Sequence, residues 1–110
     1  MKDTDALKAF SALAQDTRLS ALRLLIQAGA EGCPAGEIAT RLGVAANSMS
    51  THLKILERAE LVRPVREGRS IRYYADMGGL RALIGYLMED CCSGEPELCR
   101  PILDRITCPA

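Results

Sequence analysis

The sequence has very few aromatic residues: no tryptophan, one phenylalanine and three tyrosines among 110 residues. A core therefore has to be built from Leu, Ile, Val, Ala and Met, a composition more typical of packed helices than of a β-sandwich. No window approaches the ~20 apolar residues of a membrane span, and the first ten residues, MKDTDALKAF, lack the basic and apolar regions of a signal peptide. We predict one mainly α-helical domain, located in the cytoplasm and without membrane contact.

The sequence also lacks net charge, which by itself argues weakly against a nucleic-acid partner. The charges are distributed unevenly, however. Residues 41–74 carry seven basic and three acidic side chains, whereas residues 1–40 carry four and five and residues 75–110 carry three and six. Such a basic stretch is typical of a surface that binds a phosphate backbone, although a run of charges is more often only a solvated face. The middle third is the candidate for a binding surface.

Hydrophobic periodicity predicts two helices in the first third of the chain. In residues 4–14, Leu7 and Phe10 recur at helical spacing behind a Thr4 or Asp3 cap, and Asp16 is a candidate N-cap for a helix over residues 17–28. An apolar stripe follows this second helix until Gly29 ends it, and a loop comes next. The stripe consists of Leu19, Leu22, Leu25 and Ile26.

The next two helices are separated by a glycine turn. Pro34 suits the first turn of a short helix that ends at Gly43, where a left-handed backbone is needed. In residues 45–59 the apolar positions Met49, Leu53 and Leu56 fall at i, i+4 and i+7, with polar side chains between them. Two short helices with this connection predict a helix-turn-helix.

After Leu61 the pattern changes from helical to alternating. β-type residues flank the turn Glu67-Gly68-Arg69, which predicts a β-hairpin placed as a wing directly after the second helix. Arginine suits phosphates and narrow minor grooves. The arginines of this wing are Arg63, Arg66, Arg69 and Arg72.

A last helix opens at Gly78-Gly79 and ends at Glu89-Asp90. Its apolar positions make a broad face that needs a partner. They are Leu80, Leu83, Ile84, Leu87 and Met88. The chain thus divides into a domain over residues 1–90 and a cysteine-containing tail over residues 91–110.

Three segments together resemble the ArsR/SmtB family of metal-responsive repressors. They are ALAQDTRLSALRLL at 12–25, GEIATRLGVAANSMSTHLKILERAELV at 36–62 and REGRSIRYYA at 66–75. The resemblance implies a winged helix-turn-helix, mainly α-helical with a β-hairpin wing, that forms a homodimer through its first and last helices. It also implies repression of transcription at an operator in double-stranded DNA.

The resemblance further implies which side chains contact DNA. Polar residues of the fourth helix would lie on or beside the surface that reads base edges, whereas cationic side chains would contact phosphates and give salt-dependent affinity. His52 has an alternative role as a histidine that packs between helices. The implied contacts are Asn47, Ser48, Ser50, Thr51, His52, Lys54, Arg66, Arg69 and Arg72.

The chain departs from two inducer sites that the resemblance implies. The best-known arsenic sensors of the family carry two cysteines in the third helix, but residues 37–41 here contain no thiol. The zinc sensors carry Asp and His ligands on the last helix, and residues 80–90 offer Glu89 and Asp90 but no histidine. An effector site has to lie elsewhere.

Five cysteines in a cytosolic protein need a reason other than disulfides, because that compartment is reducing. Cys91 and Cys92 follow the last helix, and Cys99 lies beyond a linker with Gly and Pro that lets the chain turn back. Three convergent thiolates suit trivalent arsenic, which is soft, and some atypical arsenic sensors resemble this layout. We predict As(III), as arsenite or methylarsenite, as the inducer at these three cysteines and no organic cofactor. Cys33 and Cys108 are expected to be free surface thiols outside the site.

Several alternatives stay open. Cadmium, lead or zinc could occupy the same thiolates, and the thiols could sense oxidants instead. An enzyme, such as a thiol oxidoreductase, is not expected, because there is no C-x-x-C motif at a helix start and no Cys/His pair. A metal-storage protein would bind the ion without binding DNA.

Overall fold

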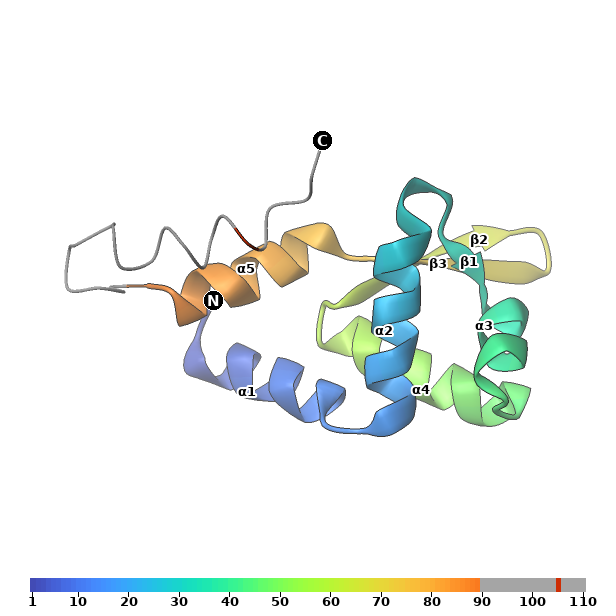
Figure 1. The fold of residues 1–110 in the computed structure, drawn as a ribbon, viewed down its shortest axis with the longest axis horizontal. Helices are drawn as coiled ribbons and strands as arrows, with labels where there is room; N and C mark the ends of the chain where they lie inside the picture. The colour runs from blue at the N-terminus through green and yellow to red at the C-terminus, as the bar shows by residue number, and fades with distance from the viewer. Residues whose placement is uncertain (90–104, 106–110) are drawn as a thin grey trace.

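The computed structural model describes residues 1–89 and 105. Its elements are α1 (Asp3–Leu13), α2 (Asp16–Ala28), the short 3-10 helix η1 (Gly29–Glu31), β1 (Cys33–Pro34), α3 (Ala35–Leu42), α4 (Ala46–Arg58), β2 (Val62–Glu67), β3 (Ser70–Ala75) and α5 (Met77–Leu87). Helices α1 and α5 lie next to each other at one end of the molecule, and α3 lies with the sheet at the other (Figure 1). The predicted fold class, mainly α with a β-hairpin wing, is confirmed.

The core lies between α2, α4 and the sheet. Leu22 and Leu25 of α2 are buried together with the predicted face of α4, Met49, Leu53 and Leu56. Gly29 ends α2 with a φ of 60°, as predicted. The N-cap of α2 is Gln15, whose side chain accepts a hydrogen bond from the Arg18 backbone N–H, and not Asp16, which is already helical. The prediction of Asp16 as the N-cap is therefore wrong.

Helix α1 turns a different face to the core than the sequence predicts. The buried residues are the small ones, Ala6, Ala9 and Ala12, whereas Leu7 and Phe10 are 67% and 42% exposed. Alanines allow α1 to approach its neighbours closely, and the large apolar side chains point away from them. The helix begins at Asp3, with Lys2 rather than Thr4 or Asp3 as its N-cap.

The sheet has three antiparallel strands in the order β1-β3-β2. The hairpin of β2 and β3 is the predicted wing. The strand β1 was not predicted, because two residues are too few to show an alternating pattern. It pairs Cys33 with Tyr73 and Pro34 with Arg72. Cys33 was expected to be a surface thiol, but it is only 2% exposed, because β1 places it against β3 and the core.

Helix α5 begins at Met77, one residue before the predicted Gly78-Gly79. Its N-cap is Asp76, whose carboxylate accepts a hydrogen bond from the Gly79 N–H at 2.9 Å. Of the predicted apolar face, Leu83 is buried while Ile84 and Leu87 are 41% and 55% exposed. The predicted tail, apart from Arg105, lies outside the described residues, and so do its cysteines.

Candidate nucleic-acid interface

A tight turn positions α4 at the surface. Gly43 ends α3 in the left-handed region with a φ of 65°, and its N–H donates to the Ala39 and Thr40 carbonyls. The Val44 N–H donates to the Ala39 carbonyl at 3.0 Å, and only three residues, 43–45, connect α3 to α4. A glycine is required here because other residues rarely adopt this backbone conformation. Helix α3, this turn and α4 together form the predicted helix-turn-helix.

The two sides of α4 differ in chemistry. Three large apolar side chains fix one side in the core, and the predicted DNA-contact residues on the opposite side are exposed: Asn47, Ser48, Ser50, Thr51 and Lys54. Two of these polar side chains also form local bonds. The Asn47 Oδ1 accepts from the Ser48 N–H at 2.9 Å, and the Thr51 hydroxyl donates to the Asn47 carbonyl at 3.3 Å. The exposed side therefore offers hydroxyl, amide and ammonium groups to a partner, and these can bind base edges and phosphates.

His52 differs from the other predicted contacts on α4. It is half-buried, and its Nδ1 lies 3.3 Å from a guanidinium nitrogen of Arg18 on α2. This contact corresponds to the alternative expected from the sequence, a histidine that packs between helices. Arg18 was overlooked in the sequence pattern. The available signal was its position four residues before Leu22 and seven before Leu25, which places a charged side chain beside the buried face of α2.

The wing presents arginines in different environments. The β2–β3 turn passes through Gly68 at a φ of 61°, and Arg66 and Arg69 near it are exposed. Neither forms an ion pair with any residue that the structure describes. Arg63 instead lies over the Tyr74 ring, 5.1 Å from its centroid. The tip of the wing thus carries two cations available to phosphates.

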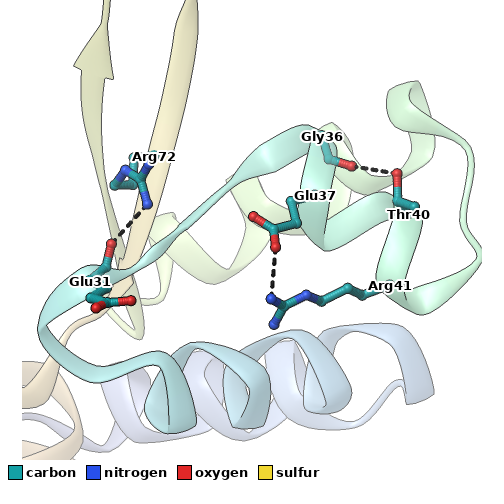
Figure 2. A network of polar contacts seen from close by, with 6 residues as sticks. All are labelled: Glu31, Gly36, Glu37, Thr40, Arg41 and Arg72. Atoms are coloured by element: carbon teal, nitrogen blue, oxygen red, sulfur yellow. Dashed lines mark hydrogen bonds and ion pairs between the residues drawn. The ribbon is translucent and has the colours of Figure 1, made fainter.

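Arg72 has its hydrogen bonds within the fold. Its Nε donates to the Glu67 carboxylate at 2.9 Å. Its Nη1 donates to the Glu31 carbonyl at 2.9 Å, as Figure 2 shows. The hydrogen bond that Arg72 donates to the Glu67 carboxylate raises the pKa of Arg72 above its ordinary value. These bonds tie β3 both to its hairpin partner and to η1, so Arg72 helps to hold the wing against the body of the domain.

The exposed face of α3 is also internally paired. Arg41 donates to Glu37 at 2.7 Å across one helical turn, and the Thr40 hydroxyl donates to the Gly36 carbonyl at 3.0 Å (Figure 2). An exposed pair of this kind adds little stability, ~0.3–0.5 kcal/mol. Because the charges of Arg41 and Glu37 offset each other, α3 adds no net charge from this pair beside the more basic surface of α4 and the wing.

The described residues contain neither a metal cluster nor a membrane span. Within residues 1–89 and 105, no group of three or more His, Cys, Asp or Glu side chains is placed to hold a metal ion. Over the same residues, no helix has the length and apolar character needed to cross a membrane. The predicted ligands Cys91, Cys92 and Cys99 lie outside the described residues.

Comparisons with known proteins agree with this geometry. Residues 13–65 match the family model of a helix-turn-helix domain. An ArsR-like transcriptional regulator from Rhodococcus sp. RHA1 has a solved structure that is 27% identical, with 96% of both chains covered and a TM-score of 0.68. The chain has the winged helix-turn-helix fold of the ArsR regulators. A search of curated proteins found no match.

Two further solved structures resemble this chain. One is the homodimeric winged helix-turn-helix DNA-binding domain of Mb0332 from Mycobacterium bovis, 27% identical over 82% of this chain and 89% of that chain, with a TM-score of 0.62. The other is named a possible transcriptional regulator for arsenical resistance. It is 26% identical over 86% of this chain and 92% of that chain, also with a TM-score of 0.62.

Proposed function

We propose that this protein is a transcriptional repressor that binds operator DNA as a homodimer and is released by trivalent arsenic. The observation that carries the DNA-binding part is the exposed polar side of α4 together with the exposed Arg66 and Arg69 at the tip of the wing. An α-helix fits the major groove of B-DNA, and a wing beside it reaches the adjacent backbone or minor groove. Asn47, Ser48, Ser50 and Thr51 would contact base edges.

Phosphate contacts account for most of the affinity in this proposal. Lys54, Arg66 and Arg69 are exposed and lie on α4 or at the tip of the wing. Because the whole chain has no net charge, its attraction to DNA has to come from such a local cluster. Each phosphate contact releases counterions, so affinity falls steeply with salt. Removing one of these cations should lower the slope of log affinity against log salt by about one unit.

The inducer part of the proposal rests on the chemistry of Cys91, Cys92 and Cys99. They follow α5, which ends at Leu87, and three thiolates match the preference of a soft metalloid for sulfur. Two features support a site there: α3 carries no thiol, and a similar protein is named for arsenical resistance. Ligation at this point would restrain the end of α5 and change the spacing of the two α4 helices in a dimer. A coupling of ~1–3 kcal/mol is typical of allosteric proteins.

The test is fluorescence anisotropy of the full chain on its own upstream DNA under reducing conditions. Arsenite should release the wild-type protein, and the Cys99→Ala variant should need much more arsenite. Cys33→Ala is the matched control, because it removes a cysteine of β1 that the proposal leaves out, and it should respond like the wild type. Release by cadmium, lead, zinc or peroxide but not by arsenite would show that the inducer is not arsenic and would identify the effective agent instead. An absence of DNA binding would overturn the repressor itself.

A further inference from the structure

One side chain of α2 contacts both α1 and α4. The Arg18 Nε donates to the carbonyl of Ala12 near the end of α1, and its Nη1 lies 3.3 Å from the Nδ1 of His52 on α4. The backbone N–H of Arg18 donates to the Gln15 side chain at 2.9 Å, which fixes the start of α2. Arg18 therefore connects a helix of the expected dimer interface with the helix that carries the expected DNA contacts.

The surroundings of Arg18 indicate a positional role. The side chain is half-buried, and the structure gives its guanidinium no carboxylate partner among the described residues. Its partners are the Ala12 carbonyl oxygen and the Nδ1 of His52. Guanidinium N–H groups project in a fixed planar fork, so two acceptors bound at once define the orientation of both. A flexible surface charge would not define any such geometry.

We propose that Arg18 is a positioning residue that fixes α4 relative to α1 through His52, and that His52 supports DNA binding as the acceptor for Arg18. This inference rests on the proposed DNA-binding function. Arginine can only donate hydrogen bonds, so the Nδ1 of His52 has to carry a lone pair and the ring proton has to be on Nε2. Affinity for DNA then depends on an acceptor at the Nδ1 position, and not on a contact between His52 and a base.

Two conservative substitutions separate these roles. The side-chain oxygen of asparagine stands where Nδ1 stands in histidine, whereas glutamine extends its amide toward the position of Nε2. If His52 acts through Arg18, His52→Asn should bind DNA within about twofold of the wild type and His52→Gln should bind about tenfold more weakly, the loss expected for one hydrogen bond to a charged group. The opposite order would identify a direct contact of Nε2 with DNA and overturn the proposal.

A second readout does not involve DNA. His52 is the only histidine in the chain, so its ring nitrogens give unambiguous 15N signals in the full-length protein. The Nδ1 should show the frequency of an unprotonated nitrogen that accepts a hydrogen bond, and Arg18→Ala should shift it, whereas Arg23→Ala on the same helix should not. An unchanged Nδ1 signal in Arg18→Ala would overturn the contact even if no operator were bound. If the wild type did not bind DNA but Arg18→Ala still shifted the Nδ1 signal, only the proposed function would be contradicted.

Thermal unfolding and sedimentation velocity test whether a variant binds DNA more weakly only because its folding or its assembly is impaired. His52→Asn and His52→Gln should have similar unfolding temperatures and the same oligomeric state, since both replace a half-buried ring by a smaller polar group. An affinity difference that follows a difference in folding or assembly would count against positioning by Arg18.

Discussion

At the scale of single residues, burial changes the chemistry that a sequence suggests. Cys33 was expected to be a free surface thiol, yet β1 buries it to 2% exposure beside Tyr73. Burial raises the pKa of the Cys33 thiol above its ordinary value of 9.0, and the negative charge of the nearby Glu37 carboxylate raises it further. A buried thiol with a raised pKa stays protonated and reacts slowly with oxidants and metals. Cys33 is therefore a structural residue, which makes it a suitable control in the arsenite experiment.

This burial predicts a dependence of stability on alkaline pH. The folded state holds the proton of Cys33 more tightly than the unfolded chain, so its contribution to the free energy of unfolding is fully present below pH 9.0 and is lost as the pH rises toward the higher folded value. Thermal unfolding between pH 7 and alkaline pH, with reductant, measures it. The wild type should lose stability more steeply above that pH than Cys33→Ala, and equal slopes would contradict the burial of an ionisable thiol.

At the scale of helices and strands, the start of α5 packs against the segment that follows α4 at a position where only glycine fits. A Cβ on Gly79 would lie 1.7 Å from the Glu60 carbonyl oxygen, and Glu60 itself has a positive φ of 62°. The Asp76 N–H donates to the Leu61 carbonyl at 2.9 Å in the same region. The beginning of α5 is thus in direct backbone contact with the chain that leaves α4. A change in α5 would therefore act directly on the segment that follows α4, the helix proposed to contact DNA.

Gly79→Ala should therefore destabilise the fold by ~1–3 kcal/mol or more, the cost of overpacking against backbone that cannot move aside. Gly85→Ala is the matched control on the same helix: nothing lies within 4 Å of its added Cβ, and alanine in a helix interior gains ~0.5–1 kcal/mol over glycine. Chemical denaturation of both variants measures the difference. Equal stability of the two variants would show that α5 does not contact Glu60 closely.

The accuracy of the sequence prediction varied between elements for a physical reason. Helix α4 buries its apolar face within one chain, so its periodicity identifies both the helix and its core residues. The stripe of α2 is only half right: Leu22 and Leu25 are buried, whereas Leu19 and Ile26 are 46% and 44% exposed. Helix α1 contacts its own core through alanines, and the stripe containing Leu7 and Phe10 predicts the helix but not its buried face. The two-residue strand β1 and the contact between Arg18 and His52 join segments far apart in sequence, which no local pattern reveals.

At the scale of the whole molecule, large apolar side chains stay exposed on the two helices that lie side by side at one end (Figure 1). Leu7 on α1 is 67% exposed and Leu87 on α5 is 55% exposed, with Phe10 and Ile84 above 40%. Such a patch typically marks a surface that binds a partner protein. A second copy of the chain fits the proposed function, because a two-fold dimer presents two α4 helices to successive major grooves.

Leu7→Glu should accordingly convert the protein to a monomer while leaving it folded, because the wild-type side chain is already mostly in water and a charge buried in a dimer interface is costly. Operator affinity should fall as well, since one chain contacts a single half-site. Leu19→Glu is the control: Leu19 is 46% exposed but lies on α2, outside the expected interface. Sedimentation velocity should find Leu7→Glu monomeric and Leu19→Glu dimeric. If Leu19→Glu dissociated and Leu7→Glu did not, the dimer would form through α2, and ligation at the end of α5 would then need another route to the DNA-binding surface.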